Sequence, residues 1–126
     1  MPDNFSSTIN SDVLKKYQKA LNESKIQDIE SLLVNDIKLT ADGGKKVKVV
    51  KATEVGKTAT ATLLAYVQQQ FLSDKTFSFH NFNHQPAICF WQNDKLYNCQ
   101  ILSIDNQGQI QQIYSIVDPV KLKNLL

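Results

Sequence analysis

Two histidines, His80 and His84, carry the side chains of this sequence that titrate nearest to neutral pH, so they are the first candidates for chemistry. If one strand ran through both, they would point to the same face about 13 Å apart. That separation is too large for one zinc ion, whose ligand bonds are about 2 Å long. No cysteine cluster or HExxH helix lies nearby, and we expect no metal site. His80 could act as a general base, but no carboxylate that would orient it is evident. We therefore favour a structural or pocket-lining role.

A set of aromatic and polar side chains could line a cavity and bind a ligand through hydroxyl, imidazole and indole N–H groups. Trp91 is the member that we favour most, because its amphipathic ring lies on a predicted central strand. The same rings would also serve as plain core packing, and the sequence leaves both roles open. The set consists of Tyr17, His80, Trp91, Tyr97 and Tyr114.

The sequence lacks the motifs of several common enzyme classes. It has no G-x-S-x-G elbow, no P-loop and no G-x-G-x-x-G segment. Four isolated carboxylates, Asp42, Glu54, Asp105 and Asp118, fall in predicted turns, and nothing suggests the acid pair of a glycosidase. We expect no cofactor and no catalytic residue, and we favour a non-catalytic protein over an enzyme.

The two cysteines, Cys89 and Cys99, lie on two strands that are predicted to be neighbours. With a two-residue turn at Asn93-Asp94, Cys89 would face Asn98, and the two cysteines would lie on opposite sheet faces. A register one residue longer would place them opposite each other. In a reducing compartment we expect both to be buried free thiols.

The charge pattern gives little indication of a nucleic-acid partner. All 14 cationic side chains are lysines, so the chain lacks the bidentate guanidinium group of arginine. The dense run 45–51 alternates with valine but contains no aromatic residue, which favours a solvated strand face. No segment approaches the roughly 20 apolar residues of a membrane span. No secretory signal is evident either, and we expect a cytoplasmic protein.

Three helices are expected in the first part of the chain, where apolar side chains recur at helical spacing. Ser24, with Gln27 three residues later, is a candidate capping box at the start of the second helix. Between the second and third helices, the turn signal Asp42-Gly43-Gly44 predicts a hairpin. The predicted ranges are 9–21, 24–35 and 57–72 for the helices and 36–51 for the hairpin.

From Lys75 onward the hydrophobic period changes from that of a helix to that of a strand. Successive strands separated by short polar turns imply three antiparallel pairings, with no room for a crossover helix. The sequence therefore predicts one α+β domain over residues 1–126, with N-terminal helices packed on a curved antiparallel sheet. Residues 1–8 are expected to be a flexible leader. A curved sheet closed by helices encloses a conical cavity, a typical ligand site.

The predicted hairpin resembles a motif of a known family, the SnoaL-like, NTF2-like C-terminal domain of certain extracytoplasmic-function sigma factors. Asp42, Gly43, Gly44 and Lys45 are similar to the Asp-Gly-Gly-Gly-Lys hairpin of that family. Lys45 stands where the family has its third glycine and Lys46 follows, so the register of the motif could shift by one residue.

The closing segment resembles the Asn-Pro-Asp-Lys-Leu motif of the same family. Pro119, Lys121 and Leu122 match it, whereas Val117 and Val120 replace its asparagine and aspartate. Residues 26–36 are similar to the leucine-rich second helix of the family, and residues 83–87 to its Asn-Gly-x-Pro-Ala strand entry. The four strings occur in the family's order along nearly the whole chain.

The resemblance implies an NTF2-like cone with a regulatory role, in which the domain packs against sigma regions and tunes their engagement with RNA polymerase. The hairpin and the closing segment would contribute to that contact. No sigma-like helices precede the domain in this sequence, so a free-standing protein and a domain cut from a sigma factor both remain open.

Two other functions also remain open. The same fold hosts small-molecule isomerases and cyclases that use the cone, and a fold alone does not decide the function. A free-standing homodimer could associate through its exposed sheet face. A small apolar ligand in the cone would be compatible with a regulatory module as well.

Overall fold

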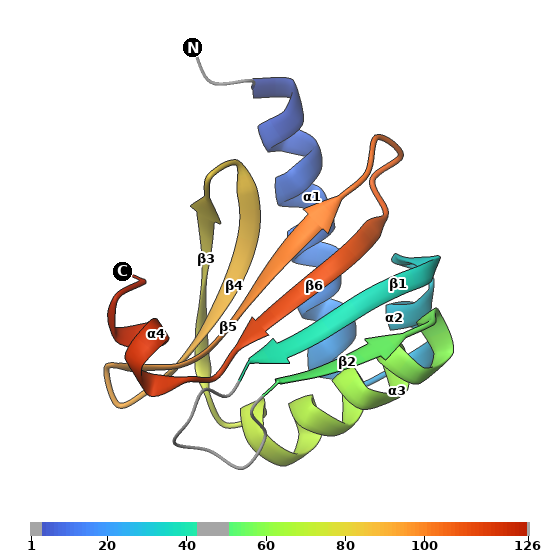
Figure 1. The fold of residues 1–126 in the computed structure, drawn as a ribbon. Helices are drawn as coiled ribbons and strands as arrows, with labels where there is room; N and C mark the ends of the chain where they lie inside the picture. Colours follow the sequence, from blue (N-terminus) through green and yellow to red (C-terminus); the bar gives the residue numbers. More distant parts are fainter. Residues whose placement is uncertain (1–3, 43–50, 126) are drawn as a thin grey trace.

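The computed structural model describes residues 4–42 and 51–125, and the side chains of residues 10–42 and 55–125. Figure 1 shows helices packed on one curved sheet. None of the described helices is long and apolar enough to cross a membrane. The elements are α1 (Asn4–Glu23), α2 (Ile26–Glu30), β1 (Leu33–Asp42), β2 (Lys51–Val55), α3 (Lys57–Val67), the π-helical turn η1 (Gln68–Leu72), β3 (Thr76–Phe82), β4 (Gln85–Gln92), β5 (Lys95–Ile104), β6 (Ile110–Ile116) and α4 (Pro119–Lys123).

The described strands form one sheet in the order β2-β1-β6-β5-β4-β3. The three antiparallel pairings predicted among the last four strands are confirmed. β1 pairs antiparallel with β2 but parallel with β6, where Leu39 lies opposite Ile113. The sheet is therefore mixed, which corrects the expectation of a purely antiparallel one. No local pattern encodes this pairing, because its two strands lie far apart in the sequence.

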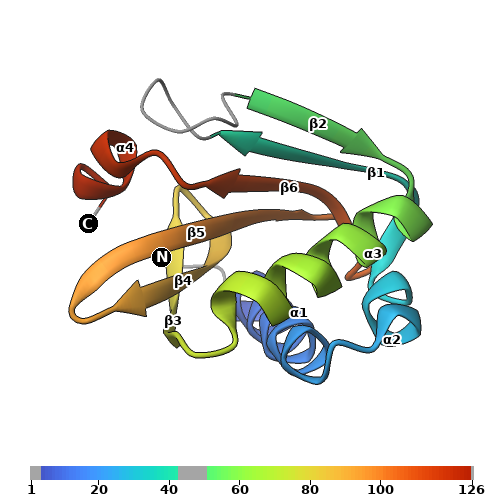
Figure 2. The same cartoon turned by 90° about the horizontal axis from the view of Figure 1, so that it is seen from below.

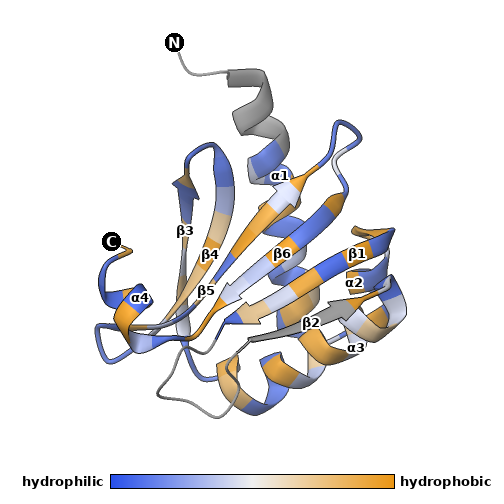
Figure 3. Cartoon of the chain, viewed as in Figure 1, coloured by the Kyte–Doolittle hydropathy of each residue, from blue (hydrophilic) through white to orange (hydrophobic). Residues whose placement is uncertain are grey.

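The inner face of the sheet, which α1 and α3 cover, carries the main core (Figure 2). Figure 3 shows apolar and polar residues in alternating bands along the strands, as expected when one side of each strand is buried. Tyr17 and Leu21 of α1 pack there with Ile88 of β4, Leu102 of β5 and Ile113 of β6. Each of these side chains is at most 1% exposed, so this layer is a continuous apolar core.

The outer face of the same sheet carries a second, smaller cluster under the short helix α4 (Figure 1). Leu122 of α4 packs there with Ala87, Cys89, Cys99 and Ile116. Because Ile113 and Ile116 belong to the same strand but to different clusters, β6 contributes to both faces.

Two helix boundaries differ from the prediction. α1 begins at Asn4, within the range expected to be a leader. α2 is only five residues long, and β1 starts at Leu33, inside the predicted second helix. Lys25 rather than Ser24 occupies the N-cap position of α2, and Ser24 has a positive φ of 53°. The capping-box prediction was thus wrong, because Ser24 ends α1 in a left-handed conformation, with its N–H bonded to the Leu21 carbonyl, whereas an N-cap residue is extended.

The predicted hairpin corresponds to β1 and β2, which pair from Asp42 opposite Lys51 to Lys38 opposite Val55. Its predicted turn and the lysine run lie in residues 43–50, outside the described residues. The predicted third helix is confirmed as α3, which continues into η1 up to Leu72. Gly56, with a φ of 101°, connects β2 to α3 in a conformation that other residues rarely adopt.

Two tight turns fix the register of the last strands. Asn83 and His84 join β3 to β4, and Asn93 and Asp94 join β4 to β5, all with φ between 50° and 68°. Two successive positive φ values are typical of type I′ hairpin turns. His84 therefore lies in a turn, whereas His80 lies in β3, and the two histidines do not share a strand face.

Candidate functional site

A buried hydrogen bond crosses the inner core between α1 and β5. The Tyr17 hydroxyl donates to Gln100 Oε1 at 2.5 Å, and both side chains are at most 2% exposed. Burial raises the pKa of the Tyr17 phenol well above its ordinary value. Tyr17 therefore stays protonated over the physiological range and acts as a hydrogen-bond donor in the core.

Three other buried polar atoms have no hydrogen-bond partner among the described residues. They are Thr60 Oγ1, Gln68 Oε1 and Asn98 Oδ1. The Asn98 amide nitrogen donates to Ser115 Oγ at 3.0 Å, so the side chain is oriented although its oxygen is unpaired. Gln68 opens the π-helical turn η1, and such turns are frequent at functional sites.

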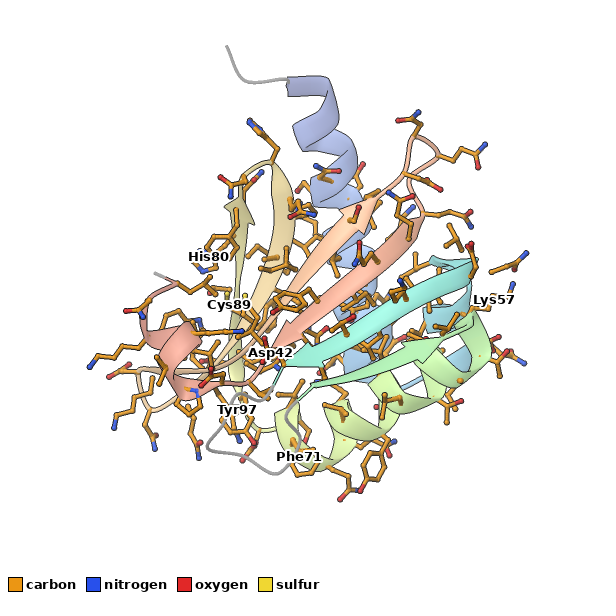
Figure 4. All side chains as sticks on the ribbon, in the orientation of Figure 1. Asp42, Lys57, Phe71, His80, Cys89 and Tyr97 are labelled. Carbon is orange, nitrogen blue, oxygen red and sulfur yellow. The ribbon has the colours of Figure 1, made fainter. Side chains whose placement is uncertain are left out.

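Tyr97 lies half-buried at the edge of the inner core, at the same end of the molecule as Phe71 (Figure 4). The Lys75 ammonium lies 4.7 Å from the centre of its ring, within the range of a cation–π contact. The Lys75 side chain is only 8% exposed, and its ammonium also pairs with Asp74 at 2.7 Å. Hydrogen bonding to Lys75 lowers the pKa of the exposed Asp74 carboxyl.

The five residues predicted to line one cavity are divided between the two faces of the sheet. Tyr17 and Tyr97 belong to the inner core, whereas Trp91 and Tyr114 pack with the outer cluster. His80 lies opposite Ala87, whose side chain is part of the outer cluster, so His80 faces outward as well. The predicted set therefore does not surround a single cavity.

The outward-facing side chains of β3 and β4 form a short hydrogen-bond chain. Trp91 Nε1 donates to Ser78 Oγ at 2.8 Å, and Ser78 Oγ lies 2.7 Å from His80 Nε2. The His80 ring is stacked near Phe82, with ring centroids 6.0 Å apart. This contact and the hydrogen bond fix the orientation of His80 on the sheet. The predicted structural role of His80 is compatible with this environment.

Of the residues predicted to contact a sigma factor, Asp42 and the closing-segment residues Pro119, Lys121 and Leu122 lie at one corner of the outer face. Asp42 Oδ2 accepts hydrogen bonds from the Tyr114 hydroxyl at 2.7 Å and from the Lys121 ammonium. Figure 4 shows Asp42 at the end of β1, next to α4. The Asp42 side chain is 8% exposed and that of Lys121 is 51% exposed. We call Asp42, Tyr114, Lys121 and Asp118 the ionic corner.

Backbone and capping contacts position the ionic corner. The Asp42 carbonyl accepts from the backbone N–H groups of Val117 at 2.9 Å and Asp118 at 3.2 Å. Asp118 is the N-cap of α4, and its side chain accepts from the Val120 N–H at 3.1 Å. Pro119 follows at the first helical position, where its missing N–H has no cost. The predicted contact residue Leu122 is buried in the outer cluster, so it anchors α4.

Electrostatic interactions in the ionic corner favour the protonated forms of its two donors. The hydrogen bond to Asp42 raises the pKa of the Tyr114 phenol and, separately, the pKa of the Lys121 ammonium. Lys121 therefore remains a cation at neutral pH, with its head group directed toward Asp42. Gly43, Gly44 and Lys45, which were predicted to belong to the same contact, lie outside the described residues.

One hollow on the sheet surface adjoins the ionic corner through Tyr114, and a second lies beside that hollow, farther from the corner. The first has a volume of about 260 Å³ and is lined by Gln85, Ile101, Ser103, Gln112 and Tyr114. The second, of about 300 Å³, shares Gln112 and is otherwise lined by Val34, Asp36, Lys38 and Gln111. Their volumes lie at or below the lower end of the range of about 300–1,000 Å³ that is typical of small-molecule pockets.

The two cysteines face each other in the outer cluster. Cys89 and Cys99 are register partners on β4 and β5, with sulfur atoms 3.1 Å apart and no exposed surface. A β-bulge between Phe90 and Trp91 adds the residue that shifts the register. Of the two registers that the sequence leaves open, the structure therefore has the longer one, and the prediction of buried free thiols is confirmed.

Two of these arrangements are not indicated by any pattern in the sequence. Ser78 and Gln100 appear as ordinary strand residues, and their hydrogen bonds to His80 and Tyr17 depend on tertiary contacts. Gln100 could have been assigned to the same core as Tyr17 only if it had been known which face of the sheet the helices cover. Among the described residues, no group of three or more His, Cys, Asp or Glu is placed to bind a metal.

Comparison with solved structures shows the fold. A protein of unknown function from Mesorhizobium loti, described as NTF2-like, is similar to this chain with a TM-score of 0.64 and 13% identity, covering 94% of this chain and 97% of its own. A bacterial protein from Silicibacter pomeroyi with a cystatin-like fold has a TM-score of 0.64 and 16% identity, covering 89% and 80%. No protein-family model matches the sequence, and no curated protein is significantly similar to it.

A third solved structure, from Xanthomonas campestris, is described as a "putative polyketide cyclase". It is similar to this chain with a TM-score of 0.60 and 12% identity, covering 92% of this chain and 95% of its own. At these identities the similarity extends to the fold alone. The chain therefore has the NTF2-like, SnoaL-like α+β fold, with helices packed on a curved sheet.

Proposed function

We propose that this NTF2-like domain is a non-catalytic regulatory module that binds a partner protein through its ionic corner. The partner that the sequence favours is the pair of polymerase- and promoter-binding regions of an extracytoplasmic-function sigma factor. One observation carries the proposal. Asp42, from the hairpin, and Lys121, from the closing segment, are bonded to each other, so one residue of each segment with the family resemblance lies in the ionic corner.

The exposure of α4 supports this surface. Lys121 is half exposed, and the neighbouring Val120 is 51% exposed although its side chain is apolar. An apolar side chain next to an oriented cation is suited to a contact with a protein surface. Asp42 contributes by orienting Lys121 rather than by direct contact, because its own side chain is nearly buried.

The contact can be tested by calorimetry with the purified chain and recombinant sigma regions from the organism that encodes it. Lys121→Met keeps the length and the apolar stem of the side chain but removes the charge, and we expect it to weaken binding by at least about tenfold. Lys123→Met is the matched control, because Lys123 is exposed on the same helix and has no bond to Asp42. It should bind within about twofold of the wild type.

Two results would count against the proposal. Absence of binding by the wild-type chain would exclude this partner, and equal weakening by both variants would indicate a diffuse charge effect rather than the ionic corner. Lys121→Arg should retain most of the affinity, because it restores a cation beside Asp42. Circular dichroism of each variant separates loss of the contact from loss of the fold.

A second candidate function is binding of a small ligand inside the cone, with an isomerase- or cyclase-type reaction as its catalytic form. The unpaired oxygens of Gln68 and Asn98 favour it, since a ligand with N–H or O–H groups would satisfy them. Such a ligand would carry polar groups, whereas the sequence analysis expects a small apolar ligand. Native mass spectrometry of the purified protein tests this function. A bound mass that Asn98→Leu abolishes would support it.

A further inference from the structure

We propose that Cys89 and Cys99 are a reversible oxidation site, at which a hydroperoxide converts the two thiols to a cross-strand disulfide, and that α4 controls access to them. This inference concerns the outer cluster and does not depend on the identity of any binding partner. It rests on the position of the two sulfur atoms and on the way in which α4 is fastened above them.

The geometry of the pair suits a disulfide. The two residues are direct register partners on adjacent antiparallel strands. Cα atoms in such pairs are about 4.5–5.5 Å apart, which lies within the range of about 4.4–6.8 Å that a disulfide spans. The sulfur atoms, 3.1 Å apart, need to approach by only about 1 Å to reach bonding distance. The bond can therefore form without a change of register.

The contact between the two sulfur atoms supplies both partners of the reaction. Whichever thiol is oxidised first has the other in place to resolve the intermediate. The hydrogen bond from Cys99 lowers the pKa of Cys89, which favours Cys89 as the first to react.

The reaction balances with hydrogen peroxide as the oxidant. The Cys89 thiolate attacks one peroxide oxygen, the O–O bond breaks, and the departing hydroxide takes a proton from solvent, which leaves a sulfenic acid and one water. The Cys99 sulfur then attacks the Cys89 sulfur while its proton is lost, and the S–O bond breaks. The released hydroxide combines with that proton as a second water. In total the two thiols lose two electrons and two protons.

Access to the thiols depends on α4. Both cysteines have no exposed surface, and Leu122 of α4 packs in the same cluster. α4 has only five residues and is fastened by the bond between Lys121 and Asp42 and by the Asp118 cap. A short segment with so few attachments opens locally at a low free-energy cost. Opening of α4 is therefore the step that admits the oxidant.

The test treats the folded wild-type protein with hydrogen peroxide and then measures it by mass spectrometry. The expected product has lost the mass of two hydrogen atoms and regains it after treatment with a reductant. Trypsin cuts after Lys75, Lys95 and Lys121, so the disulfide should link the peptides 76–95 and 96–121. The digest also distinguishes the disulfide from oxidation of Met1, because Met1 lies in a different peptide. Cys99→Ser should instead accumulate a sulfenic acid on Cys89 that dimedone traps.

A matched pair of α4 variants tests the control of access. Lys121→Met should speed disulfide formation by roughly tenfold, because it releases α4 from Asp42. Lys123→Met, on the same helix, should leave the rate unchanged. The oxidation site is wrong if both thiols of the peroxide-treated wild type still react with iodoacetamide in urea. Equal rates in wild type and Lys121→Met would overturn the role of α4.

Discussion

The two faces of the sheet differ in how they are covered and in what kind of group they bury. On the inner face, α1 and α3 cover a continuous apolar core, and the Tyr17–Gln100 bond crosses it. On the outer face, α4 covers a few apolar side chains, beside a buried carboxylate bonded to a half-exposed lysine. The first arrangement is expected to provide most of the stability, whereas the second leaves the Lys121 ammonium exposed for contacts and covers the two thiols with only one short helix.

Both faces are built from the same strands, so the comparison can be made within single elements. Ile113 and Ile116 of β6 have the same side chain and are both at most 4% exposed, yet they pack on different faces. Tyr17 and Tyr114 both donate a hydrogen bond, one to a neutral amide in the inner core and one to a carboxylate on the outer face. These matched residues give direct tests of the difference.

The largest expected effect is on the inner core. Ile113→Ala should lower the free energy of unfolding by about 2–5 kcal/mol, since the continuous core cannot collapse into the cavity. Ile116→Ala should cost less, about 1–3 kcal/mol, because α4 can move toward the gap. Urea denaturation of both variants measures the difference. Equal losses would show that the outer cluster is as rigid as the inner core.

The next effect compares the two tyrosines. Tyr17→Phe leaves the Gln100 amide oxygen buried without a donor and should cost about 1–3 kcal/mol. Tyr114→Phe should cost only about 0.5–1.5 kcal/mol, because Asp42 keeps its bond to Lys121. The double variant Tyr17→Phe with Gln100→Leu should recover part of the loss. If it does not, the hydrogen bond is not the source of the effect.

The pH dependence of stability sharpens the same comparison. The folded-state pKa of Tyr17 is raised, so its contribution is complete below its unfolded-state pKa near 10 and is lost as the pH rises above it. The free energy of unfolding should then fall by up to about 1.4 kcal/mol per pH unit for this one proton. Tyr17→Phe should remove that part of the slope in urea titrations between about pH 10 and 11. An unchanged slope would mean that Tyr17 ionises in the folded protein.

The smallest expected effect concerns the fastening of α4. Asp118→Ala removes the cap of this helix and should cost about 0.5–2 kcal/mol locally. Amide hydrogen exchange should speed up in α4, at Leu122 above all, while the amides of β5 keep their protection. Faster exchange throughout the sheet would show that α4 is part of the global folding unit.

Much of the fold follows from local patterns in the sequence. The period of α3 and the positions of the turns at Asn93 and Gly108 identify the main helix and the strands that follow it. The boundary between α2 and β1 could not be read in this way, because Leu33 suits a helix and a strand equally. The parallel pairing of β1 with β6 is decided by packing of the whole sheet.

Some residues of the candidate site could be predicted from the sequence and others could not, and the physical reason differs between them. Asp42 and Lys121 were identified through the resemblance, and the structure brings them together. Trp91 and Tyr114 were assigned to the cone but lie on the outer face, since both faces of these strands carry apolar residues and the period of two does not say which one the helices cover. The β-bulge that places Cys89 opposite Cys99 cannot be recognised from any local pattern in the sequence.

The parallel pairing of β1 with β6 also has a kinetic consequence. Leu39 must meet Ile113, so the sheet closes only when the two ends of the domain come together. Contacts between such distant segments are slow to form, because the loop between them must be ordered first. β1 therefore remains without its second neighbouring strand until β6 is in place, and this late docking should limit the rate of folding. Until then the edge of β1 is open to other chains, so refolding at high concentration should favour aggregation.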